Sequence, residues 1–212
     1  QLSYLNPEPD RWRSRTESDL DRALGNAGAA EHYIDMEWVP AGALDATDRL
    51  AFADSLAFHG EQSAKVGLLP YRILELTQRI RVGFRLWRAA ESDQERAWIE
   101  ARIIDDAGIL GHYVADGSNP HHTTIHYNGW AGDDETALTA PARDLGPLRP
   151  AVWSYVADTH TLVERLYDLD EAESFGPETT GADHHAFAVD RLAAGAAMLR
   201  DLWWTAWVSS AE

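Results

Sequence analysis

Two histidine–carboxylate pairs are the residues of this sequence best suited to chemistry, His112 with Asp116 and His160 with Glu164. On a helix, residues i and i+4 lie on one face. Each pair could therefore present an imidazole nitrogen and a carboxylate oxygen to a single cation. A solvated pair on a helix surface has the same spacing, so one pair alone does not distinguish a metal site from an exposed pair.

The residues around His112 favour the metal-site interpretation. Apolar side chains at 109–110 and 113–114 flank His112 and Asp116 and predict a buried face. Charged side chains are buried mainly when they are paired or bound to a metal. Beyond a turn at Pro120, where the chain could return further ligands, three more histidines follow: His121, His122 and His126.

Four other residues are weaker candidates. Asp35 ends the segment Glu31-His-Tyr-Ile-Asp35, and His59 ends a predicted helix. Taken alone, each is more commonly structural than functional. His184 and His185 are predicted to lie on the surface, in the first turn of the last helix.

Helices must position these side chains, because apolar residues recur three or four positions apart and strand-like alternation is hard to find. The sequence Ser92-Asp-Gln-Glu95 is a capping box that opens one of the helices. Loop-like composition marks 23–30 and 131–150. The predicted fold is all-α, a single helical-bundle-like domain. Its expected helices are 47–59, 69–87, 92–116, 150–169 and 183–207.

Composition limits the function classes. The chain has 212 residues, of which 45% are hydrophobic, enough for one well-filled core and against a disordered chain. Its 18 basic and 35 acidic residues give a net charge of −17, which argues against a broad basic face for nucleic acid. Cysteine is absent, so a transition metal must use histidine and carboxylate ligands. No apolar run is long enough to predict a membrane span.

Several of these motifs, in this order, resemble the zinc-dependent phospholipase C / P1-S1 nuclease family. The most specific match is Leu110-Gly-His-Tyr-Val-Ala-Asp-Gly-Ser-Asn-Pro-His-His122, which is similar to the family signature H-x3-D-x5-H. The resemblance covers most of the chain and implies the all-α fold of that family. The other matching segments are 9–13, 31–35, His59 with 66–71, 126–130 and 201–207.

The resemblance implies two or three zinc ions. Its first zinc would be held by Asp35, His59, His112 and Asp116, and its second by His122, His160 and Glu164. Asp116 would bridge to a third zinc, which the family binds through an N-terminal Trp and a nearby His. Neither residue type occurs before Trp12 here, so we expect the domain, residues 1–212, to lack an N-terminal segment or to have an incomplete third site. His121 replaces the usual Leu and is an alternative ligand to His122.

The implied activity is zinc-dependent phosphoric diester hydrolysis, in which a zinc-activated water attacks phosphorus. Asp35 is the candidate to orient or deprotonate that water. Glu164 in H-x3-E and the lack of cysteine resemble the phospholipase branch, so we expect a phospholipase C-like substrate. The alternatives are a P1/S1-type single-strand nuclease and a catalytically incomplete, zinc-stabilised helical module. The family implies a secreted or periplasmic protein, and we expect a monomer.

Two other metal-dependent helical classes fit the sequence poorly. HD-type phosphohydrolases need an adjacent His-Asp pair, and no His-Asp dipeptide occurs here. Carboxylate-bridged di-iron proteins need paired Glu-x-x-His motifs. The nearest spacings in this chain are i,i+4 with histidine first.

Overall fold

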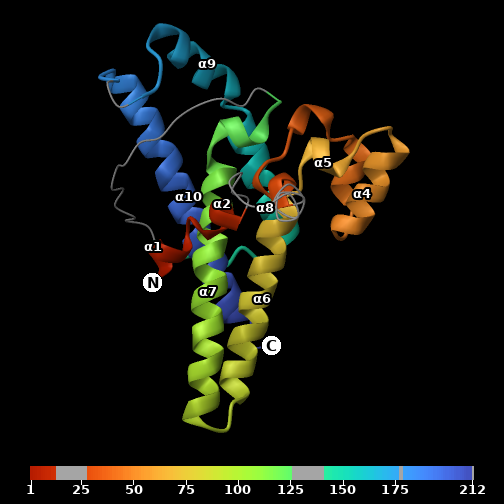
Figure 1. Cartoon of the computed structure of the whole chain (residues 1–212), viewed down its shortest axis with the longest axis vertical. Helices are drawn as coiled ribbons and strands as arrows, with labels where there is room; N and C mark the ends of the chain where they lie inside the picture. Colours follow the sequence, from red (N-terminus) through yellow and green to blue (C-terminus); the bar gives the residue numbers. More distant parts are fainter. Residues whose placement is uncertain (13–27, 126–140, 177–178, 212) are drawn as a thin grey trace.

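The computed structural model describes residues 1–12, 28–125, 141–176 and 179–211 (Figure 1). Within these ranges every regular element is a helix, which confirms the predicted all-α fold. The longer helices are α4 (Arg49–Phe58), α6 (Leu69–Ala89), α7 (Asp93–Ser118), α8 (Leu148–His160), α9 (Val163–Ala172) and α10 (Ala182–Ser209). The shorter ones are α1 (Leu2–Leu5), α2 (Glu8–Trp12), α5 (Ser63–Val66) and the 3-10 turns η1 (Ala30–His32), η2 (Met36–Trp38), η3 (Ala41–Asp45) and η4 (Pro120–Thr123).

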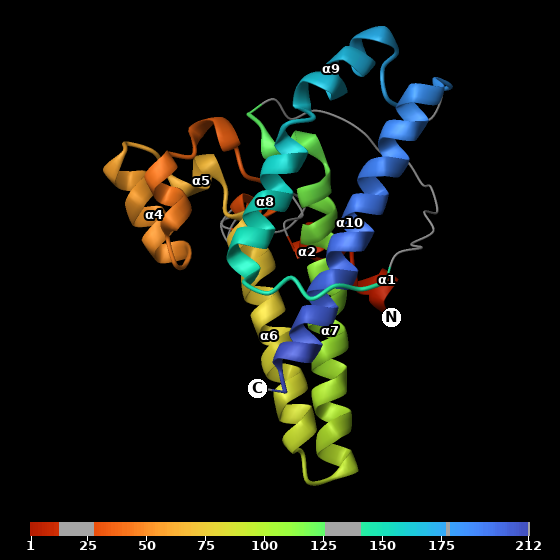
Figure 2. The same ribbon diagram turned by 180° about the vertical axis from the view of Figure 1, so that it is seen from behind.

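Three long helices form the body of the molecule. Helices α6 and α7 run antiparallel as a hairpin, and α10 packs along both of them (Figures 1 and 2). Helix α8 packs against α6, α7 and η4, whereas α4 and α5 stand to one side of the bundle in both views. The carboxyl end of α7 therefore lies where segments from several parts of the chain can meet it.

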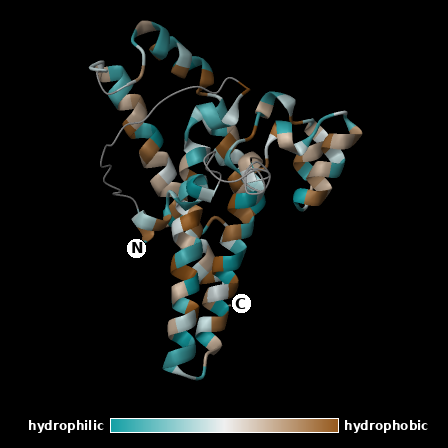
Figure 3. Ribbon diagram, in the orientation of Figure 1, coloured by the Kyte–Doolittle hydropathy of each residue, from teal (hydrophilic) through white to brown (hydrophobic). Residues whose placement is uncertain are grey.

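The core lies between the long helices. Leu76, Ile80, Leu110 and Leu202 are at most 1% exposed, and burying each such side chain contributes about 1.5–3 kcal/mol. Polar and apolar residues share each long helix in Figure 3, as expected of amphipathic helices. Within the described ranges, no helix combines the length and the apolar character needed to span a bilayer.

The predicted capping box at the start of α7 is present in part. The Ser92 hydroxyl accepts a hydrogen bond from the Glu95 backbone N–H at 3.2 Å. The Glu95 carboxylate accepts from the backbone N–H of Glu91 at 3.1 Å, one residue before the serine. Helix α7 then runs to Ser118, slightly further than predicted, and carries both His112 and Asp116.

The prediction of one continuous helix over 150–169 is wrong, because the structure has two helices there. Helix α8 ends at His160, and α9 begins at Val163. The Thr161 hydroxyl donates to the Asp158 carbonyl at 2.7 Å. A short polar side chain that bonds to the backbone in this way competes with the helical hydrogen bonds. His160 and Glu164 consequently lie on different helices, and their i,i+4 spacing does not place them on one face.

The amino-terminal helices pack closely on α7 at a glycine. A Cβ atom on Gly108 would lie 2.6 Å from the Cβ of Leu5, so only glycine permits α1 to approach this closely. Helix α2, with Asp10, follows α1 directly. This contact brings an acidic residue from the start of the chain toward the site on α7.

Candidate metal centre

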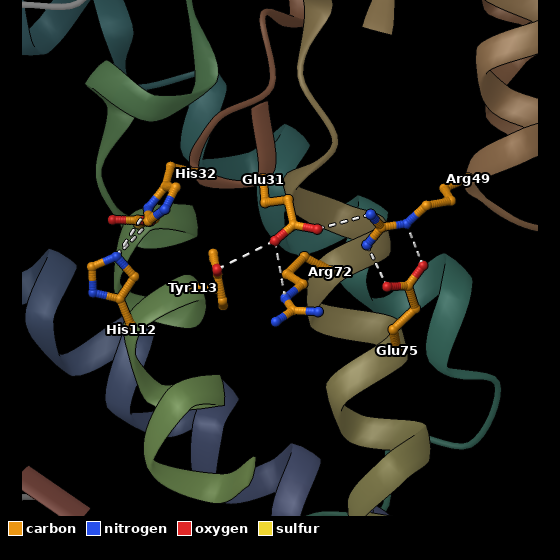
Figure 4. A network of polar contacts seen from close by, with 8 residues as sticks. Glu31, His32, Arg49, Arg72, Glu75, His112 and Tyr113 are labelled. Atoms are coloured by element: carbon orange, nitrogen blue, oxygen red, sulfur yellow. Dashed lines mark hydrogen bonds and ion pairs between the residues drawn. The ribbon is translucent and has the colours of Figure 1, made fainter. Parts of the chain in front are cut away.

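Three side chains from two distant parts of the chain converge near the carboxyl end of α7 (Figure 4). The Nδ1 of His32 lies 3.0 Å from the Nε2 of His112 and 3.1 Å from the Oδ2 of Asp116. The His112 Nε2 lies 3.4 Å from the same Asp116 oxygen. Both histidines are buried, and the Asp116 side chain is 12% exposed. Two ring nitrogens and a carboxylate oxygen thus form a triangle.

The dimensions of this triangle match those of a zinc ligand set. Bonds of about 2.0–2.2 Å at tetrahedral angles separate neighbouring zinc ligands by about 3.3 Å. The three edges between His32, His112 and Asp116 measure 3.0, 3.1 and 3.4 Å. A fourth donor is near, since the Asp10 Oδ2 lies 3.9 Å from the His112 Nε2. Asp10, His32 and His112 can direct one ligand atom each to within 4.8 Å of one another.

Backbone hydrogen bonds hold the segment around His32 in place. The Leu68 N–H donates to the Ala30 carbonyl at 2.6 Å, and the Asp35 N–H donates to the Val66 carbonyl at 2.7 Å. Gly67 lies between these positions with φ +98°, and a Cβ there would be 2.1 Å from the Tyr33 carbonyl oxygen. The tight Gly67 turn therefore fixes the segment that carries His32.

Glu31, the neighbour of His32, faces the opposite way and anchors the segment through charge (Figure 4). Its carboxylate accepts from Arg49 Nη1 at 2.8 Å and pairs with Arg72 Nε at 3.3 Å. The Tyr113 hydroxyl donates to it at 3.4 Å. Burial raises the pKa of Tyr113 to about 12, against the opposing charge of Arg72, so this tyrosine stays protonated at neutral pH. Glu31 is thus structural, which leaves His32 to face α7.

Two further histidines are oriented through their Nδ1 atoms. The His122 Nδ1 donates to the His32 carbonyl at 2.6 Å, and the His160 Nδ1 donates to the Thr123 carbonyl at 2.8 Å. A carbonyl can only accept, so in the neutral ring the Nε2 keeps its lone pair. Metal-bound histidines in proteins are held in the same way. Both rings are therefore in the tautomer that a metal ligand requires.

Asp116 lies between the triangle and His122. Its Oδ2 belongs to the triangle, and its Oδ1 lies 3.7 Å from the His122 Nδ1. Asp116 therefore lies within reach of histidines on two sides, although the His122 atom nearest to it is the Nδ1 that donates to the His32 carbonyl.

A cavity of about 310 Å³ opens beside these residues. Asp116, His121 and His122 form one part of its wall. Another part comes from α9, α10 and the segment between them. A small molecule in this cavity would contact Asp116 and His122, whereas His32 and His112 are not among the residues that line it.

The structure separates the predicted ligands into groups. His112 and Asp116 lie in the triangle, and His122 lies beside it. His59 is exposed at the end of α4, where its Nδ1 donates to the Ser55 carbonyl at 2.8 Å, and it is not part of the triangle. Asp35, which is 5% exposed, follows His32 in the segment that the Gly67 turn holds in place.

Two other predicted positions are less informative. Glu164 is exposed in the first turn of α9. His126 lies outside the described residues.

The prediction that His184 lies on the surface is wrong. Its side chain is buried, and its Nε2 donates to the Leu169 carbonyl at 2.8 Å and to the Glu173 carbonyl at 2.7 Å. Leu169 lies in the last turn of α9 and Glu173 is the residue that follows the helix, so His184 caps the end of α9. His185 is exposed, as predicted.

The sequence analysis did not identify two members of the site. His32 was a neighbour of the candidate Asp35, and its position three residues before that aspartate was the available signal. Asp10 belongs to segment 9–13, which was singled out only because it resembles a segment of the phospholipase C / P1-S1 nuclease family. Its approach to His112 depends on the packing of α1 against α7, which has no local signature in the sequence.

Comparison of the chain with models of protein families, with curated proteins and with solved structures returned no match.

Proposed function

We propose that this protein is a zinc-dependent phosphodiester hydrolase whose zinc ligands include His32, His112 and Asp116. The observation that carries the proposal is the triangle formed by these three side chains, whose edges suit one tetrahedral zinc. The resemblance of residues 110–122 to the signature of the zinc-dependent phospholipase C family supports the reaction class.

The donor set also favours zinc on chemical grounds. Two imidazoles and a carboxylate, with a second carboxylate near, suit zinc better than they suit magnesium or calcium, which prefer oxygen ligands. His122 and His160, whose Nε2 atoms are available, are the ligands that we propose for a second zinc. Glu164 would complete that second set.

Different residues would perform different parts of the hydrolysis. Bound zinc would supply Lewis-acid activation of the phosphate and lower the pKa of a coordinated water. His32, His112 and Asp116 would hold the ion, and the Glu31 network keeps His32 in place. Asp35, buried three residues after His32, remains our candidate to orient the attacking water. The cavity beside Asp116 and His122 would admit the substrate.

A phospholipase C-like substrate stays the first choice, and single-stranded nucleic acid is the alternative. The net charge of −17 opposes the approach of a long polyanion more than that of a single headgroup. We expect a short-chain phosphatidylcholine to be hydrolysed faster than single-stranded DNA or RNA at equal protein concentration. Cleavage of nucleic acid alone would reverse this order.

The test is the zinc content of the purified protein, measured by elemental analysis together with hydrolysis of bis(p-nitrophenyl) phosphate. We expect one or more zinc ions per chain and activity that a chelator removes and zinc restores. His112→Ala should lose both zinc and activity. His185→Ala is the matched control, because it removes an exposed histidine from another helix.

Each result decides between the candidate functions. Equal zinc content in the two variants would remove His112 from the site. If His112→Ala loses zinc but the unmodified protein hydrolyses no phosphodiester, the result would support the zinc-stabilised helical module. A protein that binds no added zinc would overturn the proposal.

A further inference from the structure

Tyr113, which follows His112 on α7, packs its ring against both histidines of the triangle (Figure 4). Its ring centroid lies 5.0 Å from that of His32 and 5.4 Å from that of His112. The centroids of the two imidazoles are 4.9 Å apart, and their planes are nearly perpendicular, at 82°. The Tyr113 side chain is buried. Three rings therefore pack against one another in pairs, and two of them carry proposed zinc ligands.

Polar contacts hold the Tyr113 ring in place. Its hydroxyl donates to the Glu31 carboxylate at 3.4 Å, and the Arg72 guanidinium lies over the ring face, 5.3 Å from the centroid. Arg72 also pairs with the Glu31 carboxylate at 3.3 Å. A cation over an aromatic face is attracted to it, so the guanidinium adds to the hold on the ring. The tyrosine is thus fixed at its hydroxyl and at its face, and it gives the two histidines a rigid surface.

A shared cation requires that the two imidazoles keep one relative orientation. The Nδ1 of His32 and the Nε2 of His112 point toward each other at 3.0 Å, although the residues are 80 positions apart. Their backbones fix where the side chains begin, but each imidazole can still turn about its χ1 and χ2 torsions. If the surface beside both rings were removed, these torsions would gain freedom. Binding a metal would then cost the conformational entropy of ordering them again.

We propose that Tyr113 is a positioning residue of the metal centre, whose ring holds His32 and His112 in the orientation that binds one cation. This inference deepens the proposed function and rests on its ligand set of His32, His112 and Asp116. Tyr113 acts through the two histidines and is not itself a ligand. The ring carries this role more than the hydroxyl does, because the hydroxyl bond to Glu31 is long, whereas the ring packs against both imidazoles.

Tyr71 on α6 offers a matched control, because it is a second buried tyrosine of the same bundle. Its hydroxyl donates to the Ala46 carbonyl at 3.2 Å, and its ring packs against Phe52 and Trp153. Loss of either tyrosine ring leaves a space in the core and should lower stability. The Tyr113 ring, however, packs against proposed zinc ligands. Comparison of the two positions therefore separates an effect on the metal centre from an effect on stability.

Zinc titration of the whole chain, in competition with a fluorescent chelator, tests the assignment. Tyr113→Leu should lower zinc affinity at least about tenfold, as other residues that orient metal ligands do. Tyr113→Phe keeps the ring and should bind zinc within about threefold of the unmodified chain, because it loses only one long hydrogen bond. Tyr71→Leu should bind zinc normally. Bound Co²⁺ gives a second readout, since its visible spectrum reports coordination geometry, and this spectrum should change in Tyr113→Leu alone.

The zinc-free protein gives a readout that does not depend on the metal. The imidazole N–H signal from the hydrogen bond between His32 and His112 should appear in the proton NMR spectrum of the unmodified chain and of Tyr113→Phe. In Tyr113→Leu this signal should be lost to exchange with water. Its persistence in Tyr113→Leu would overturn the positioning role.

The outcomes separate this inference from the proposed hydrolysis. Unchanged zinc affinity in Tyr113→Leu, or an equal loss in Tyr71→Leu, overturns the role of Tyr113 and leaves the zinc proposal standing. A loss in Tyr113→Phe as large as that in Tyr113→Leu overturns the role of the ring and assigns the effect to the bond with Glu31. A protein that binds no zinc, yet loses the imidazole signal in Tyr113→Leu alone, would support the positioning role and reject the proposed function.

Urea denaturation of each variant separates lost zinc binding from lost folding. If Tyr113→Leu does not fold, Tyr113→Met takes its place with the same expected results, because methionine is flexible enough to fill more of the space that the ring leaves. Full zinc affinity in a folded Tyr113→Met would overturn the inference.

Discussion

The Nδ1 of His122 donates a 2.6 Å hydrogen bond to the carbonyl oxygen of His32, although the two residues are 90 positions apart. The Ile34 N–H in turn donates to the His122 carbonyl at 2.8 Å. Two hydrogen bonds in opposite directions therefore join the segment after η1 to η4. They join one histidine of the triangle to His122, so a change at either histidine should disturb the position of the other.

His122→Ala should reduce zinc affinity at least tenfold. Mutation of a residue that supports a metal ligand commonly lowers metal affinity by 10- to about 100-fold. The substitution removes both the anchored ring and its support of His32. His121→Ala is the comparison, because the His121 ring packs edge-on against Tyr167, with the ring centroids 5.9 Å apart. Titration with a fluorescent zinc chelator measures both variants. A larger loss in His121→Ala would identify His121 as the ligand.

Asp10→Asn should weaken zinc binding by about tenfold, less than His112→Ala does, because Asp10 is half-exposed and more distant from the ligand nitrogens. Glu8→Gln provides the comparison, since Glu8 lies on the same helix and pairs with Arg11. Equal zinc affinity in Asp10→Asn and in the unmodified chain would restrict the first site to the triangle.

Gly67→Ala should destabilise the fold by at least about 1–2 kcal/mol, the cost of placing a side chain in left-handed backbone geometry. The added methyl group would also meet the Tyr33 carbonyl oxygen and displace the segment that carries His32. Urea denaturation measures the first effect, and zinc titration measures the second. Gly42→Ala, where a Cβ has open space, should change neither. Full zinc affinity in Gly67→Ala would show that the turn does not position His32.

Asp201→Asn should destabilise the protein at neutral pH by about 1–3 kcal/mol, as for a buried charged hydrogen-bonding group. Burial raises the pKa of Asp201, but hydrogen bonds from Arg200 and Arg143 outweigh burial and hold it below its usual value. A depressed folded-state pKa adds stability above the unfolded value, near 3.8, and that stability is lost as the pH falls through the folded pKa.

Urea denaturation of Asp201→Asn and the unmodified chain over a pH series checks this sign. The stability difference should shrink steadily as the pH drops below 4. The exposed Asp54→Asn on α4 should show little difference at any pH. If the stability difference between Asp201→Asn and the unmodified chain stays constant at acidic pH, the carboxylate charge of Asp201 does not contribute to stability.

The sequence predicted the long helices well, because the apolar stripe of α6 and the Ser92 cap of α7 are local signals. His112 and Asp116 were identified for the same reason, because a separation of four positions on one helix places both side chains on the same face. The break between α8 and α9 escaped prediction because it depends on hydroxyl–backbone hydrogen bonds such as that of Thr161. Burial of His184 depends on the packing of α10 against the end of α9, and apolar spacing does not report such contacts.

His32 rather than His59 reaches the His112 triangle for a related reason. The position of His32 follows from hydrogen bonds to residues 66 and 68 and to His122, all distant in sequence. His59 was proposed from family resemblance, but the helix that ends before it stands beside the bundle. Long-range backbone pairing, rather than residue type, decides which histidine faces α7.

The hairpin of α6 and α7 has a consequence for how the protein folds. Its contacts are local, with a short connection at 90–92, and local contacts form fastest during folding. The bond between His32 and His112 spans 80 positions, so it closes a long loop at a greater entropic cost. The hairpin should therefore form first and carry His112 and Asp116 as half a site. On refolding, helical circular dichroism should return before the capacity to bind zinc.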